Sequence, residues 1–201
     1  MARAGSAVIA RAAYVDGVVT FADKPTLRGS RVLLRPMVAD DAANMWADVH
    51  DDEATRLTGT HGALQRSQID EWCATRADQP DRLDLAVIDL GTGDWVGEVV
   101  INDWDPDNRS CGFRIALGPT GRNRGLGTEA THLIVDYVFD QLDDPPVNRI
   151  ALEVYDFNPR AAAVYEKAGF RREGVLRQAL LWDGDFHDAI VMSIVRRDRM
   201  P

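Results

Sequence analysis

The sequence predicts a single domain of the α/β (α+β) class, in which helices flank a mixed, mostly antiparallel sheet. Three observations predict it. Residues 83–117 hold three successive strand-like segments, a glycine-rich loop then precedes a long amphipathic helix, and the chain ends in a strand–turn–strand pattern. With 201 residues, 45% of them hydrophobic and 27% charged, the chain has the size and composition of one globular domain.

Composition excludes several classes of partner. The formal net charge is −9, and such an acidic surface repels nucleic-acid phosphates. No apolar run approaches the ~20 residues that span a bilayer, so we expect no membrane contact. Cys73 and Cys111 lie far apart without metal-ligand spacing, so we expect no disulfide, no metal site and a cytoplasmic location.

Residues 1–24 are expected to be an N-terminal extension, ahead of a domain spanning residues 25–201. Arg11 interrupts the apolar stretch that a signal peptide would need. Asp16-Gly17 separates two short β-prone runs, which predicts a hairpin. Because so small a hairpin is marginal alone, we expect it to pack on the domain or on a second subunit of a homodimer.

The first part of the domain is predicted to contain one strand and two helices. Residues 31–35 form the strand, which Pro36 ends, and Asp40 or Asp41 can cap the first helix. Ser67 opens a capping-box pattern ahead of the second helix. The buried side of that helix is expected to carry Ile69, Trp72 and Cys73. Residues 51–62, between the helices, show no regular pattern.

The central strands are predicted at residues 83–90, 95–102 and 110–117, joined by short polar turns into an antiparallel meander. Each consists largely of apolar and β-branched residues. The glycine-rich loop follows the third strand directly, so the next helix begins at the carboxyl end of that strand. Ligands of mixed sheets commonly bind at such an edge.

The last part is predicted to be a strand at 148–157, a helix and a terminal hairpin. Asn158 caps the helix, Pro159 occupies its first position and Gly169 follows its end. One face of this helix carries Ala161, Val164, Tyr165 and Ala168. Residues 176–182 and 186–195 then pair across Asp183-Gly184.

The segment Gly121 to Thr131, GRNRGLGTEAT, is predicted to bind phosphate. Its glycines precede a helix whose first N–H groups lack intrahelical partners and lie at the positive end of the helix dipole. Gly125 and Gly127 leave those groups accessible, while Arg122 and Arg124 add positive charge.

The sequence of this loop allows two other interpretations. Gly125, Gly127 and Ala130 also satisfy the G-x-G-x-x-G/A pattern of dinucleotide-binding folds. That pattern normally follows the first strand of a chain directly, whereas seven residues intervene here and more than half of the chain has passed. The glycines could also form a turn without a ligand.

Arg122-x-x-Gly125-x-Gly127, followed by Thr128-Glu129-Ala130, resembles the CoA-binding motif of the GNAT superfamily of N-acetyltransferases. The resemblance extends over residues 27–200. The run from Asn158-Pro159-Arg160 to Tyr165-Glu166-Lys167-Ala168-Gly169-Phe170 is similar to the RimJ/RimL-like branch, which acetylates N-termini of ribosomal proteins. It implies a GNAT fold, with a splayed strand pair that holds acetyl-CoA.

The resemblance also implies roles for individual residues. Tyr165 would be the general acid that protonates the departing thiolate. The loop 51–62 would help wall the acceptor site. The residues implied to bind acetyl-CoA are Ile115, Leu117, Arg122, Asn123, Arg124, Gly125, Leu126, Gly127, Thr128 and Asn158. Without the resemblance, Tyr165 reads equally well as a core residue.

The general base is not evident from the sequence. Many GNAT enzymes carry a glutamate on the strand that corresponds to residues 110–117, and this strand holds no acid. Ala161 stands where relatives often have serine, which disfavours a hydroxyl-assisted mechanism. The nearby carboxylates, each interpreted as surface or structural, are Glu98, Asp103, Asp105, Glu153 and Asp156.

We therefore expect an acetyl-CoA-dependent N-acetyltransferase whose acceptor is a peptide or protein N-terminal α-amine. Without a base on the strand, an amine of low pKa is the easier acceptor. The alternatives are a small-molecule amine, such as an antibiotic or polyamine, and a non-catalytic acyl-CoA-binding module.

Overall fold

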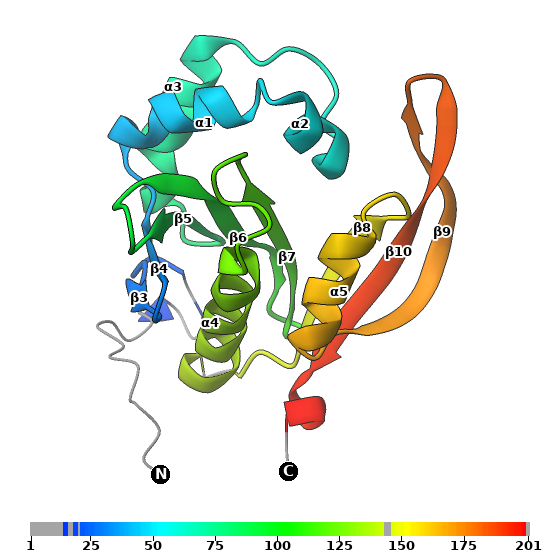
Figure 1. Cartoon of the computed structure of the whole chain (residues 1–201). Helices are drawn as coiled ribbons and strands as arrows, with labels where there is room; N and C mark the ends of the chain where they lie inside the picture. The colour runs from blue at the N-terminus through cyan, green and yellow to red at the C-terminus, as the bar shows by residue number, and fades with distance from the viewer. Residues whose placement is uncertain (1–13, 16–17, 20, 143–145, 200–201) are drawn as a thin grey trace.

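The structure is a computed structural model that describes residues 14–15, 18–19, 21–142 and 146–199 (Figure 1). Near the N-terminus, β1 (Tyr14–Val15) pairs antiparallel with β2 (Val18–Val19). The Asp16-Gly17 turn predicted between them lies outside the described residues.

The remaining strands form one eight-stranded sheet in the order β3-β4-β5-β6-β7-β8-β10-β9. Every neighbouring pair is antiparallel except β7–β8, which is parallel. The strands are β3 (Leu27–Arg28), β4 (Val32–Pro36), β5 (Leu83–Asp89), β6 (Trp95–Asp105), β7 (Ser110–Leu117), β8 (Arg149–Tyr155), β9 (Arg171–Trp182) and β10 (Asp185–Val195). The predicted mixed, mostly antiparallel sheet is confirmed.

Helices lie on both faces of the sheet (Figure 1). On one face, α4 (Leu126–Gln141) and α5 (Pro159–Lys167) cover the larger core, which includes Phe113, Ile134 and Tyr165. On the other, α1 (Ala42–Asp48) and α3 (Arg66–Thr75) enclose a smaller cluster that includes Met37 and Ile69, and α2 (Asp52–Thr58) lies on the same side without a buried residue. Short 3-10 turns lie at Ala39–Asp41, Arg76–Asp78 and Arg196–Arg199.

Three local predictions need correction. Residues 51–62 contain helix α2, because the Asp51 carboxylate caps it by accepting from the Ala54 N–H and Gly59 ends it at φ 62°. Helix α3 begins at Arg66 with Gln65 as its cap, so the capping box involves Gln65 and Gln68 and not Ser67.

Strand β9 begins five residues before the predicted start at 176. Its first nine residues are exposed, so no buried–exposed alternation marked them as a strand. Pairing with β10 nevertheless continues past an irregularity opposite Asp188, where Gln178 has φ 54° and its N–H donates to the Asp188 carboxylate. The β9–β10 hairpin projects from the body of the molecule (Figure 1).

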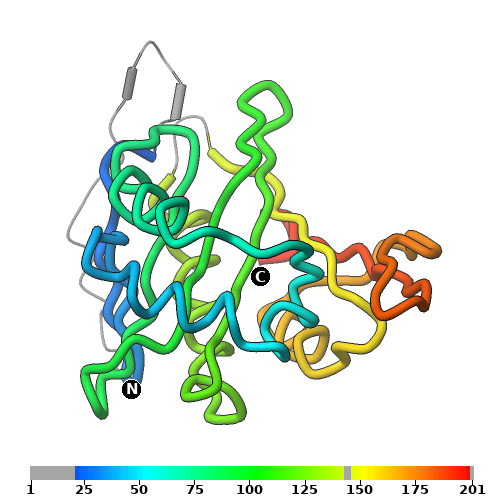
Figure 2. The backbone as a smooth tube through the Cα atoms, turned by 90° about the horizontal axis from the view of Figure 1, so that it is seen from above, coloured from blue at the N-terminus to red at the C-terminus, as the bar shows by residue number. Residues whose placement is uncertain are grey.

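Seen from above, the segment from α1 to α2 crosses over β6 and β7 toward the side where α5 lies (Figure 2). At the end of this segment, Glu53 of α2 forms an ion pair with Arg160 of α5, with 3.2 Å between Oε1 and Nη2. Together these elements surround the place where β7 and β8 separate.

Candidate active site

The parallel strands β7 and β8 separate after three paired residues. Ser110–Gly112 pairs with Arg149–Ala151, and no further pairs form between these strands in the described residues. Beyond Gly112, β7 stays paired with β6 as far as Leu117, and β8 stays paired with β10 as far as Tyr155. The strands therefore diverge toward their carboxyl ends, and a cavity of about 870 Å³ opens between them.

This cavity passes through the sheet from one face to the other. Side chains alternate along β7, so Phe113, Ile115 and Leu117 point toward the core under α4 and α5. The intervening Arg114 and Ala116 point to the opposite face, toward α2. Both sets line the cavity. It therefore has two halves, one beside the N-terminus of α4 and one beside α2.

The half beside α4 provides an open helix N-terminus. Gly125 is the N-cap at φ 76°, and no side chain caps the helix. A Cβ at Gly127 would lie 3.0 Å from Leu117 Cδ1, so glycine keeps this wall of the cavity clear. Uncapped N–H groups at the positive end of a 16-residue helix suit the phosphates of CoA.

Most of the predicted cofactor-binding residues meet at this cavity. Those that line it are Ile115, Leu117, Arg122, Asn123, Gly125, Gly127, Thr128 and Asn158. Arg124 and Leu126 do not line it. Leu126 is fully buried in the core, and Arg124 donates to the Asp89 carboxylate and to the Thr120 carbonyl.

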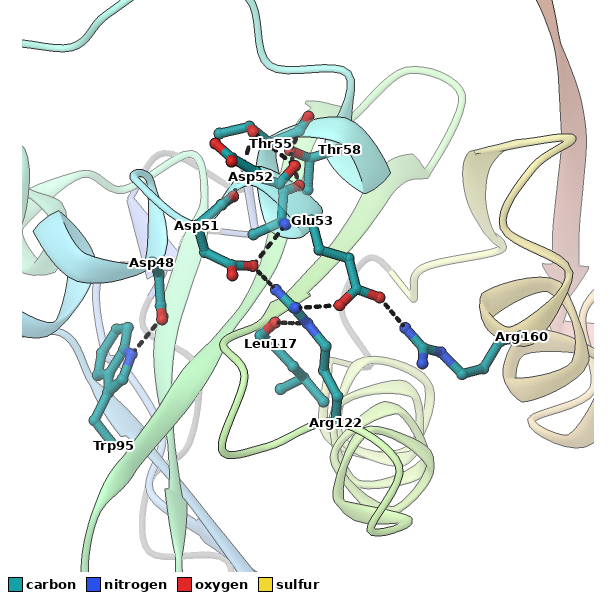
Figure 3. Close-up of polar contacts among 11 residues, drawn as sticks. Asp48, Asp51, Asp52, Glu53, Thr55, Thr58, Trp95, Leu117, Arg122 and Arg160 are labelled. Atoms are coloured by element: carbon teal, nitrogen blue, oxygen red, sulfur yellow. Dashed lines mark hydrogen bonds and ion pairs between the residues drawn. The ribbon is translucent and has the colours of Figure 1, made fainter.

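Arg122 is held by protein groups (Figure 3). Its Nε donates to the Leu117 carbonyl at 2.8 Å, Nη1 donates to Glu53 at 2.7 Å, and Nη2 pairs with Asp51. Burial opposes ionisation of Asp51, but the hydrogen bonds from Arg122 and the Ala54 N–H outweigh it and lower the pKa of that carboxyl. With its side chain only 8% exposed, Arg122 ties α2 to the glycine loop and its charge is already compensated.

Tyr165 reaches the cavity from α5. Its ring packs edge-on against Phe113, with 5.9 Å between ring centroids, and also contacts Phe170. Burial raises the pKa of its hydroxyl well above the ordinary value. The phenol therefore keeps its proton at neutral pH. Asn158 caps this helix by accepting from the Ala161 N–H, as predicted.

The half beside α2 contains three charged residues that sequence reasoning did not assign to the site: Asp103, Arg114 and Glu153. Arg114 donates to Glu98 at 2.7 Å. Burial raises the pKa of Glu98, although Arg114 opposes this, and Glu98 Oε2 has no partner among the described residues. These three charged residues come from three different strands, β6, β7 and β8. They lie apart in the sequence, so no local pattern indicated that they meet. Within the described residues, no cluster of potential metal ligands and no helix long and apolar enough to cross a membrane is found.

Comparison with known proteins agrees with this geometry. Residues 31–171 match the family model described as acetyltransferase (GNAT) domain. The N-acetyltransferase YokL of Bacillus subtilis, described as uncharacterized, is 26% identical over 171 residues, which cover 85% of this chain and 93% of that protein. The L-amino acid N-acetyltransferase AaaT of Escherichia coli is 32% identical over 128 residues, or 62% of this chain and 75% of that protein.

Solved structures support the same fold. The spermidine N-acetyltransferase of Vibrio cholerae, solved with CoA and spermine, superposes with a TM-score of 0.77 at 21% identity and covers 85% of this chain and 98% of that one. The family match spans more than half of the chain, and the sheet splits between β7 and β8 beside the uncapped N-terminus of α4. The chain therefore belongs to the GNAT family and is an acetyl-CoA-dependent N-acetyltransferase.

Proposed function

We propose that the acceptor is an α-amine with a carbonyl group on the adjacent carbon, as at the N-terminus of a peptide or protein. The observation that carries this proposal is Arg114 in the wall of the α2 half of the cavity. Its ion pair with Glu98 leaves other guanidinium N–H groups available to a carbonyl or carboxylate. Across the split, Glu153 offers a carboxylate to the amine.

Acetyl-CoA would enter from the α4 side. The main-chain N–H groups of Gly127 and Thr128 would bind phosphate, and the free edge of β7 at Ile115 and Leu117 would pair with the pantetheine arm. Arg122 and Arg124 would contribute less charge than their sequence suggests, because carboxylates of Asp51, Glu53 and Asp89 already pair with them. Tyr165 would donate its proton to the departing thiolate.

The pKa of the acceptor amine also favours an α-amine. At pH 7.5 an α-amine of pKa about 8 is roughly a quarter neutral, whereas a lysine of pKa about 10.4 is neutral about once in a thousand molecules. An α-amine therefore costs less to deprotonate than a lysine, whichever group accepts the proton. AaaT, by its name, also acts on amines of this class.

A polyamine is the second candidate. Asp103 and Glu153 both line the cavity and attract ammonium groups, and the related Vibrio cholerae enzyme binds spermine. Arg114 argues against it, because a guanidinium in the same wall repels a second ammonium group. The RimJ/RimL-like motifs of the C-terminal half favour the peptide.

The test is a competition between acceptors, with products located by mass spectrometry. One peptide has a free N-terminus and blocked lysines, its counterpart has a blocked N-terminus and free lysines, and spermidine is the third acceptor. We expect the first peptide to be acetylated fastest. Faster acetylation of spermidine or of the lysine peptide contradicts the proposal.

Arg114 can be tested separately. Arg114→Gln removes a charge-assisted hydrogen bond of about 1.5–3 kcal/mol, so kcat/KM for the free N-terminal peptide is expected to fall about 10- to 100-fold. An alkyl monoamine, which has no carbonyl, is expected to be affected much less. Arg177→Gln is the matched control, because Arg177 is exposed on β9 outside the cavity. Equal losses for both acceptors mean that Arg114 does not recognise the carbonyl.

A further inference from the structure

The two strands that separate at the cavity place one cation and one anion opposite each other. Gly112 of β7 and Ala151 of β8 are the last paired residues. Two residues further along each strand stand Arg114 and Glu153, on the same face of the sheet because side chains alternate. In an unsplit parallel pair these residues would be neighbours. Here Arg114 pairs with Glu98 of β6, and Glu153 faces the cavity.

Glu153 differs from most carboxylates around the site. Asp51, Glu53, Asp89 and Glu98 all form ion pairs with arginines. Within the part of the chain that the structure describes, Glu153 has neither an ion pair nor a side-chain hydrogen bond. An uncompensated carboxylate in the wall of a cavity is available to a ligand that carries a proton and a positive charge.

We propose that Glu153 is the catalytic base, which accepts a proton from the acceptor ammonium, and that Asp103 helps to position this ammonium. This inference rests on the proposed function only in that the acceptor is an amine. Asp103 lies at the closed end of the split, where its Oδ2 would be 3.2 Å from a Cβ built on Gly112. The same Oδ2 accepts a hydrogen bond from Asn102 Nδ2 at 2.8 Å, and Asn102 Oδ1 would be 2.7 Å from that Cβ, so glycine at 112 makes room for these two side chains.

In the proposed step the acceptor nitrogen loses two protons, one to Glu153 and one to Tyr165. Glu153 takes one proton from the ammonium, and the neutral nitrogen attacks the thioester carbon. As the C–N bond forms and the C–S bond breaks, Tyr165 gives its proton to the thiolate and regains one from the nitrogen. Glu153 then releases its proton to solvent. The products are the amide, CoA as a thiol and one proton.

The other carboxylates near the split have partners or lie elsewhere. Glu98 is paired with Arg114 and does not line the cavity. Asp105 accepts two hydrogen bonds from Asn108. Asp156 contacts His187 and accepts from the Asp188 N–H.

Several ionisable groups line the cavity together with Glu153. They are Asp103 of β6, Cys111 and Arg114 of β7, Arg122 of the glycine loop, Tyr155 of β8, and Arg160 and Tyr165 of α5. On β10 the cross-strand partner of Glu153 is the apolar Val191, and α2 contributes only Ala54, Leu57 and Thr58 to the cavity.

The experiment compares wild type with Glu153→Gln over pH 6 to 9, measured as thiol release with whichever amine the wild type acetylates. Glu71→Gln is the matched control, since Glu71 is exposed on α3 outside the cavity. We expect Glu153→Gln to lower turnover about 10²- to 10⁴-fold at the lower end of this range. The deficit is expected to shrink as the pH approaches the amine pKa, because the neutral amine then no longer needs the base.

Glu153→Asp is expected to recover part of the activity, and Asp103→Asn to raise KM for the amine more than it lowers kcat. A Glu153→Gln deficit that is independent of pH, or turnover close to that of wild type, overturns the proposal. A different result is expected if the acceptor is not an α-amine. The wild type would then prefer spermidine or lysine, while the pH-dependent deficit of Glu153→Gln could still be observed with that amine.

Discussion

At the residue scale, Tyr165 illustrates how burial supports a chemical role. Only 7% of the residue is exposed, and burial raises the pKa of the hydroxyl, so a proton is present at any pH at which the enzyme works. The same ring is part of the core, in contact with Phe113 and Phe170. The core and catalytic interpretations of this residue are therefore compatible.

We predict that Tyr165→Phe lowers kcat about 10²- to 10⁴-fold while affinity for CoA and the thermal midpoint stay near those of wild type. The ring and its contacts remain, and only the proton donor is lost. Tyr137→Phe is the matched control, because Tyr137 is also buried but lies in α4 outside the cavity. Steady-state kinetics and calorimetry measure the effects. If both variants keep full turnover, Tyr165 serves packing alone.

Individual residues differed in how far sequence alone could identify them. Tyr165 and Gly127 stand in contiguous motifs, so local patterns located them. Glu153 and Arg114 stand in strands whose neighbours carry no motif, and their meeting depends on the parallel register of β7 and β8. A register between strands separated by a helix cannot be read from local spacing.

At the element scale, the N-terminus of α4 can be tested without destroying the fold. The two glycines differ: Gly125 has φ 76°, where a side chain costs about 1–2 kcal/mol, whereas Gly127 has no such constraint. Gly127→Ala is therefore the cleaner substitution. Its new methyl group would meet the flexible ends of Leu117, at 3.0 Å, and of Ile115, at 3.8 Å, and alanine favours a helix by about 1 kcal/mol over glycine.

We predict that Gly127→Ala preserves or raises thermal stability while CoA binds about tenfold or more weakly, because the methyl group obstructs the approach to the helix N-terminus. Isothermal calorimetry and thermal melting provide the two readouts. Gly174→Ala is the control, since a Cβ there meets nothing within 4 Å and lies far from the loop. Unchanged CoA affinity contradicts the phosphate-binding role of the loop.

The Glu173 carboxylate attaches the β9–β10 hairpin to β8, a role that the sequence did not indicate. Arg149 of β8 pairs with Glu173 of β9, and Ser193 of β10 donates to the same carboxylate at 2.7 Å. The hydrogen bonds from Arg149 and Ser193 lower the pKa of Glu173 to about 2. The carboxylate thus joins three strands across the edge of the sheet.

We predict a pH-dependent effect of Glu173→Gln on the free energy of unfolding. A depressed pKa contributes stability that is fully present above about pH 4.5, the unfolded value, and is lost as the pH falls toward about 2. The variant is therefore expected to be less stable than wild type at pH 7 and nearly equal to it near pH 2. Urea titrations at several pH values measure this difference, and a deficit that persists unchanged at low pH contradicts it.

At the scale of the whole molecule, most of the order of elements was accessible from the sequence, but neither the existence nor the position of α2 was. The meander, the loop and α5 follow from periodicity and caps that lie within each segment. Helix α2 is short and has no fully buried residue, so it carries no amphipathic pattern. Its place over the cavity depends on Arg122 and Arg160, which contact it from sequence distances of about 70 and 107 residues.

The charge of the whole molecule leads to opposite salt effects on the two substrates. At −9, the protein attracts cationic acceptors and repels anionic acetyl-CoA at long range. Near the phosphate site, Asp51, Glu53 and Asp89 compensate Arg122 and Arg124, so local positive charge does little to cancel this repulsion. Salt shortens the range of both effects, from about 30 Å at 0.01 M to about 10 Å at 0.1 M.

We therefore predict that raising the salt concentration over this range lowers kcat/KM for a basic peptide acceptor several-fold. The KM for acetyl-CoA is expected to stay the same or to fall. A peptide with the same first residues and an uncharged remainder is the control, and its kcat/KM is expected to change less. To separate the effects on the two substrates, initial rates are measured with the peptide varied at saturating acetyl-CoA, and with acetyl-CoA varied at saturating peptide. Equal salt dependence of the two peptides would show that long-range charge does not select the acceptor, and recognition would then lie in the cavity around Asp103, Arg114 and Glu153 alone.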